Sequence, residues 1–187
     1  LVHHLNRDQF GPLDRATEIS PRALLVYTVA KKLKAAGAQQ LVIGSWELNV
    51  VACGVAAAVD LPVWQAAQST AAALVKLRLM PVGLVGTRSD DEENFWKRCL
   101  RDHGIGALLP SVSDRAWIRT CLSERTAPEE CRAGWIRIAT ELRHAGANTL
   151  VLCTPEANSY LRDEDVMLPL VCAAGQQVKA AVDAAGA

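Results

Sequence analysis

The stretch VGLVGTRSDDEENFWKRCLRDHGI (residues 82–105) decides the fold class of this 187-residue chain. It opens with an apolar run (82–87) that is typical of a buried strand ending in a glycine turn. The following run (89–104) has acidic residues in its first turn and Gly104 at its end, which predicts a helix. A buried strand that leads through a tight turn into a helix is typical of a parallel α/β sheet.

The same alternation extends outward over the whole chain. The patterns predict helices at residues 20–38, 47–59, 69–79, 89–104, 112–124, 128–145 and 175–186. They predict strands at residues 40–45, 61–65, 82–87, 105–110 and 167–172, and a strand that runs into a turn at residues 148–156. Because such alternation places helices on both faces of parallel sheets, we predict an α/β fold. We expect two pseudo-symmetric small lobes, residues 1–80 plus 165–187 and residues 81–164, with a ligand cleft between them.

Composition limits the classes of partner. Twenty basic residues balance twenty acidic ones, so we expect neither nucleic acid nor an anionic membrane as a partner. No apolar run approaches the roughly 18 residues that a membrane span needs, and no signal peptide is visible. The six cysteines form no CxxC pair and have no zinc-finger spacing to histidine, so we expect no metal site and reduced, buried thiols in a cytoplasmic protein.

Three segments of the chain match one known family in order and spacing. They are GAQQLVIGSWELN (37–49), VGLVGTRSDDEENFWKRCLRDHGI (82–105) and GANTLVLCTPEANSYLRDEDVMLPLV (146–171). Together they resemble the aspartate/glutamate racemase family over about residues 1–182. The resemblance implies two lobes that clasp a small amino acid or carboxylate, and a homodimer. It also implies that one cysteine from each lobe faces the substrate α-carbon, one removing a proton and the other returning it, with no cofactor.

This chain departs from the family at the reacting positions. In the first motif, Ser45 stands where the resemblance implies the first cysteine. Trp46 and Glu47 replace the Asn-Thr pair that would hold the substrate carboxylate, and Asn49 replaces a histidine. A thiol, with a reference pKa of about 8.5, can be tuned to exchange protons near neutral pH, whereas an unassisted hydroxyl cannot.

The second motif, LCTPE (152–156), allows two alignments. An ungapped match places Thr154 on the family's second cysteine and Glu156 on its glutamate. A match with Pro155 inserted places Cys153 on that cysteine instead. Both alignments stay open at this point.

The candidate site residues fall into two groups. The catalytic candidates are Ser45, Cys153, Thr154, Glu47 and Glu156. The substrate-binding candidates are His4, Arg7, Trp46, Asn49 and Thr87. Arginine suits bidentate carboxylate binding, and a helix N-terminus after Thr87 suits an anion.

Two functional hypotheses follow. In the first, the chain is a cofactor-independent isomerase-type enzyme that acts on a small amino acid or carboxylic acid with altered catalytic residues. In the second, it is a catalytically degenerate racemase scaffold that binds a ligand or a protein. A one-sided decarboxylase or lyase reaction is a further alternative, because a single acid on one face suffices for it.

Overall fold

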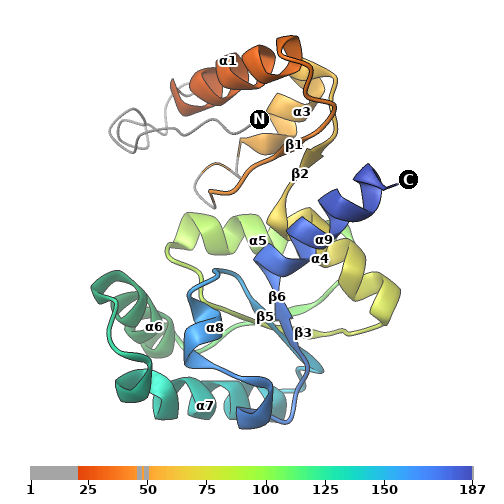
Figure 1. Ribbon diagram of the computed structural model, residues 1–187. Helices are drawn as coiled ribbons and strands as arrows, with labels where there is room; N and C mark the ends of the chain where they lie inside the picture. Colours follow the sequence, from red (N-terminus) through yellow and green to blue (C-terminus); the bar gives the residue numbers. More distant parts are fainter. Residues whose placement is uncertain (1–20, 46–47, 49–50, 187) are drawn as a thin grey trace. The chain divides into compact units, whose positions relative to one another are not determined.

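The structure is a computed structural model that describes residues 21–45, 48 and 51–186 (Figure 1). The chain forms two compact units, Leu1–Gln65 and Ala66–Ala187. The predicted lobe boundaries, at residues 80/81 and 164/165, stay a prediction. No described helix is both long enough and apolar enough to cross a membrane.

The first unit is a small α/β arrangement. Its described elements are α1 (Pro21–Ala35), β1 (Leu41–Val42), α3 (Ala52–Val59) and β2 (Val63–Trp64). The two strands are parallel, with Leu41 opposite Val63 and Val42 opposite Trp64. Buried aliphatic residues from both helices, from β1 and from the segment that follows β1 form its core: Val26, Ala30, Leu41, Ile43, Leu48, Ala52, Val55 and Val59.

The second unit holds a four-stranded parallel sheet in the order β4-β3-β5-β6. The strands are β3 (Val82–Val85), β4 (Ala107–Leu108), β5 (Thr149–Leu152) and β6 (Leu170–Cys172). The helices are α4 (Ala66–Leu77), α5 (Asp90–Asp102), α6 (Val112–Glu124), α7 (Pro128–His144), α8 (Ala157–Tyr160) and α9 (Ala173–Ala185), with a 3-10 turn, η2, at Asp163–Asp165. Both central strands are buried along their whole length, as expected for strands covered on two faces.

Successive residues of β5 point to opposite faces of the sheet, as the pleat of a strand requires. Leu150 and Leu152 belong to a core cluster with residues of α6, α7 and α8. Val151 belongs to a second cluster with residues of α4, α5 and α9. The helices therefore cover both faces of the sheet, as Figure 1 shows, and the predicted parallel α/β class is confirmed.

The observed elements differ from the predicted ones mainly at their ends. β5 ends at Leu152, where its pairing with β3 ends at Val85, and the chain then turns toward α8, as expected for a strand that runs into a turn within 148–156. The last helix begins at Ala173, two residues before its predicted start, with Cys172 as its N-cap. Within the predicted helix at 47–59, residues Ala52–Val59 form α3.

The structure also describes where five of the cysteines lie. Cys121, Cys131 and Cys153 are buried, as predicted, whereas Cys99 and Cys172 are only half-buried. Cys121 and Cys131 come from α6 and α7 and belong to the core cluster between these helices and the sheet. They pack there as small apolar side chains.

Candidate functional site

Three strands of the second unit end level with one another. Val85 of β3 lies opposite Leu152 of β5, and Leu152 lies opposite Cys172 of β6. The residues that follow these strands therefore share one edge of the sheet. In open parallel sheets this carboxyl edge is where ligands bind.

The turn after β3 contacts the turn after β5. Gly86 has a φ of +85°, a conformation that favours glycine. A Cβ atom at this position would lie 3.2 Å from the Cβ of Ala157 and 3.4 Å from the Oγ1 of Thr154. A side chain at position 86 would therefore be both strained and crowded. Thr87, which follows this glycine, is also buried.

Thr154 carries a buried hydroxyl without a partner. Its side chain is only 1% exposed, and among the described residues its Oγ1 atom makes no hydrogen bond. An unsatisfied buried hydroxyl costs about 1–3 kcal/mol of folding free energy. A strand-end position that keeps such a group is suited to a hydrogen bond with a ligand.

Cys153 points the other way. Its side chain belongs to the apolar cluster beneath α4, α5 and α9, together with Val151. Burial, followed by the negative charges of Glu92 and Glu93, raises the pKa of the Cys153 thiol well above its ordinary value. A thiol in this environment is a poor source of thiolate, which is the reactive form of cysteine.

Glu156, on the turn after β5, forms an ion pair with Arg88. The Arg88 Nη2 atom lies 2.6 Å from the Glu156 Oε1 atom, and the two side chains are 25% and 55% exposed. This pair joins the turns that follow β3 and β5. Sequence reasoning assigned Arg88 no role and therefore missed this contact. The available signal was the position of Arg88 directly after the Gly-Thr turn, at the edge where Glu156 was also expected.

Glu92 supports the same turn from the first turn of α5. The backbone N–H of Arg88 donates to the Glu92 Oε2 atom at 2.6 Å, while the Glu92 N–H donates to Ser89 Oγ. Its second carboxylate oxygen is buried and has no hydrogen-bond partner among the described residues. Burial raises the pKa of Glu92 to about 7, even though the Arg88 N–H and guanidinium oppose the shift.

The raised pKa of Glu92 predicts a loss of stability with rising pH. The Glu92 carboxyl stays neutral in the folded protein up to about pH 7, whereas in the unfolded chain it ionises near pH 4.5. The free energy of unfolding therefore falls as the pH rises between these two values. The expected loss is about 3 kcal/mol. Glu92→Gln stays neutral, so its stability relative to wild type should increase from pH 4 to pH 8.

Urea denaturation at both pH values measures this difference. Glu124→Gln provides a control, because Glu124 lies exposed at the end of α6. A Glu92→Gln variant whose relative stability is the same at pH 4 and pH 8 would contradict the assigned pKa.

The remaining predicted site residues are not brought together by the described part of the chain. Ser45 is half-buried after β1 in the first unit, where its carbonyl accepts the N–H of Leu48. His4, Arg7, Trp46, Glu47 and Asn49 lie outside the described residues. Their proximity to the β5 turn therefore stays a prediction.

The third strand of the edge ends in a half-buried thiol. Cys172 Sγ accepts hydrogen bonds from the Asn158 side chain at 3.2 Å and from the Gly175 N–H at 3.5 Å. It thereby caps α9. In residues 21–45, 48 and 51–186, no cluster of histidine, cysteine or acidic side chains could hold a metal ion.

Open α/β proteins with parallel sheets commonly bind small ligands at such an edge. The family model for Asp/Glu/hydantoin racemases matches residues 12–182, and the chain belongs to that family. The family predicted from the three sequence segments is therefore confirmed.

Solved structures agree with this assignment. A protein proposed to be an Asp/Glu racemase, from Yersinia pestis, is 27% identical, with a TM-score of 0.82, 88% of this chain covered and 74% of the other. An aspartate racemase homologue from Pyrococcus horikoshii is 18% identical, with a TM-score of 0.88 and coverages of 100% and 83%. An arylmalonate decarboxylase is 16% identical, with a TM-score of 0.60 and coverages of 89% and 77%. The last two likenesses concern the fold alone.

Proposed function

We propose that this chain is a cofactor-independent, racemase-type enzyme that acts on the α-carbon of a small carboxylic acid or amino acid, with altered reacting residues. Its membership of the Asp/Glu/hydantoin racemase family supports the reaction class. The observation that carries the proposal is the buried, unpartnered hydroxyl of Thr154 at the carboxyl edge of the sheet. The homodimer and the cytoplasmic location expected from the sequence belong to the same proposal.

Thr154, rather than Cys153, is assigned the second reacting position. The Cys153 thiol lies in the apolar core and its pKa is raised well above the ordinary value. The Thr154 Oγ1 atom instead lies beside the Gly86 turn, and it has no competing partner among the described residues. This difference favours the ungapped alignment of LCTPE (152–156).

A threonine hydroxyl is a weak base, so the proposed chemistry depends on its neighbours. The hydroxyl can donate a proton, or a hydrogen bond, to an α-carbanion, which is far more basic than an alkoxide. Glu156, on the same turn, is the proposed carboxylate base or relay, and Arg88 holds it in place through their ion pair. Thr87, on the turn that leads from β3 to the Ser89 cap of α5, is proposed to bind the substrate carboxylate, since helix N-termini favour anions.

The candidates that the sequence places in the first unit have proposed roles of their own. Ser45 is the reacting candidate there, and Glu47 is the alternative acid or base. Trp46 and Asn49 are proposed to shape the substrate pocket. His4 and Arg7 are proposed to bind the substrate carboxylate.

Proton exchange at the α-carbon tests the proposal. Single enantiomers of aspartate, glutamate and related α-substituted carboxylates are incubated with the purified chain in heavy water. The α-proton signal is followed by NMR, and the enantiomer ratio is followed by chiral chromatography. Catalysed loss of the α-proton with inversion supports a racemase, whereas loss without inversion supports a one-sided enzyme. Absence of exchange over the whole panel would argue against an active enzyme.

A binding scaffold is the alternative that the weak basicity of Ser45 and Thr154 favours. In that case a carboxylate ligand raises the melting temperature of the chain without being consumed. A decarboxylase reaction would instead consume a malonate-type diacid and release carbon dioxide. Including one such diacid in the panel separates this alternative from the other two.

A further inference from the structure

A cavity lies away from the carboxyl edge of the sheet, between α7 and the segment that leads into β6. It has a volume of about 250 Å³ and is lined by Ala139, Thr140, Arg143, Asp165, Val166, Met167 and Leu168. Residues 166–168 precede β6 and Arg143 lies in the last turn of α7, which precedes β5. The cavity is therefore near the amino ends of these strands. The proposed reacting residues lie at the opposite ends, so this cavity is a separate site.

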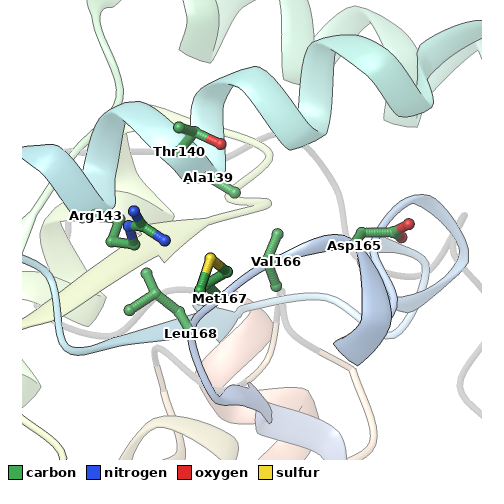
Figure 2. Close-up of a pocket in the computed structure, with 7 residues that line it drawn as sticks. All are labelled: Ala139, Thr140, Arg143, Asp165, Val166, Met167 and Leu168. Carbon is green, nitrogen blue, oxygen red and sulfur yellow. The ribbon is translucent and has the colours of Figure 1, made fainter.

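The charges around this cavity are unbalanced. Asp165 is already neutralised, because the Arg132 Nη2 atom lies 2.8 Å from its carboxylate and the Arg162 N–H also donates to it. The Arg143 guanidinium, in contrast, has no ion pair among the described residues. In Figure 2 the Arg143 guanidinium points toward Met167, whereas the Asp165 carboxylate points away from it. The free charge that faces the cavity is therefore positive.

The backbone carbonyl groups at the end of α7 already accept other hydrogen bonds, so they do not compete with a ligand for the N–H groups of the Arg143 guanidinium. The N–H groups of Ala145 and Gly146 donate to the carbonyl oxygens of Glu141 and Arg143, at 2.9 Å each. The Thr140 hydroxyl donates to the Ile136 carbonyl at 2.8 Å, so it offers an acceptor rather than a donor. Arg143 is consequently the main donor that this cavity presents to a ligand.

The apolar part of the lining comes from one short segment. Val166 and Leu168 are half-buried, whereas the Met167 side chain is 84% exposed. An exposed methionine is a flexible apolar surface that adapts to the shape of a ligand. The cavity thus combines a bidentate cation on one side with aliphatic and thioether groups on the other.

We propose that this cavity is a second binding site for a small monocarboxylate with a branched or short aliphatic body. The carboxylate pairs with the Arg143 guanidinium through two parallel N–H···O bonds. The aliphatic body packs on Val166, Met167 and Leu168. A volume of about 250 Å³ has room for a ligand of this small size.

Methionine NMR can detect this binding directly, because the chain has only two methionines, Met80 and Met167. The full chain is labelled with ¹³C at the methionine methyl groups and titrated with isovalerate at low chloride concentration. Met167→Leu assigns the two signals. We expect a saturable shift of the Met167 signal and a constant Met80 signal. Isovaleramide, which has the same shape but no charge, should bind at least tenfold more weakly.

Arg143→Gln should weaken isovalerate binding at Met167 at least tenfold. Arg98→Gln is the matched control, since Arg98 lies exposed on α5, and it should leave the titration unchanged. Absence of a Met167 shift, equal binding of the amide, or unchanged binding in Arg143→Gln would each overturn the proposal. Because the readout is the Met167 signal and not turnover, these outcomes are independent of whether the carboxyl edge of the sheet is catalytic.

Discussion

Thr154→Cys is expected to raise the rate of α-proton exchange at least tenfold on any substrate that the wild-type chain exchanges. Thiols have a reference pKa of about 8.5, so a far larger fraction of cysteine than of threonine is deprotonated near neutral pH. Exchange with solvent needs a base on only one face of the α-carbon. The higher exchange rate should therefore appear even though Ser45 still carries a hydroxyl and not a thiol.

The position of Thr154 makes this substitution structurally mild. Cysteine replaces the Thr154 hydroxyl with a larger sulfur but also lacks the threonine methyl group, so the volume of the side chain changes little. Initial rates by NMR in heavy water, from pH 6 to pH 9, should show a new rise with pH that iodoacetamide abolishes. A correctly folded Thr154→Cys chain with an unchanged rate would place the reacting position elsewhere.

Trp135→Ala is expected to lower the free energy of unfolding by about 3–5 kcal/mol, the range for removing a large buried aromatic side chain. Trp135 is 1% exposed in the core beneath α6 and α7. It stacks on Tyr160, with ring centroids 5.0 Å apart and an interplanar angle of 8°. The alanine variant leaves a cavity and also removes the platform that holds Tyr160 near α6.

The Tyr160 ring that stacks on Trp135 also carries a hydroxyl that contacts the end of α6. The hydroxyl oxygen lies 3.2 Å from the Cys121 carbonyl oxygen and 2.9 Å from the Thr126 carbonyl oxygen, to which it can donate. This contact connects α8 to the end of α6. Loss of Trp135 should weaken this link as well. Urea denaturation followed by far-ultraviolet circular dichroism measures the total effect.

Trp135→Phe is the matched control for the alanine variant. Phenylalanine keeps a ring against Tyr160 and removes the indole N–H, which has no hydrogen-bond partner among the described residues. Its cost should be less than half of the alanine cost. Equal costs for the two variants would show that the stacked ring is not what stabilises this core.

The parallel α/β class was readable from the sequence because its strands are continuously apolar. The residues of β3 and β5 are buried on both faces, so hydrophobic runs mark them without any knowledge of the fold. The α5 helix was equally clear, because Ser89 caps it and its first turn is acidic. The short helix α8 was not predicted, since four residues carry too little periodicity.

The candidate site was predictable in its location but not in its detail. Thr154, Glu156 and Thr87 were placed at strand ends from sequence, and they do follow β5 and β3. The direction of the Cys153 side chain could not be decided, because it depends on where the pleat of β5 stops. The Arg88–Glu156 pair and the buried Glu92 depend on contacts between two turns that are far apart in sequence. Spacing along a single strand does not contain that information.

The most direct test of the account compares Thr154→Val with Cys153→Ala in α-proton exchange. Valine keeps the shape of threonine without its hydroxyl, and alanine removes the thiol from the core. We predict that Thr154→Val falls to the uncatalysed rate in heavy water, whereas Cys153→Ala stays within threefold of wild type at a temperature where both are folded. Loss of exchange in Cys153→Ala together with its retention in Thr154→Val would contradict the account.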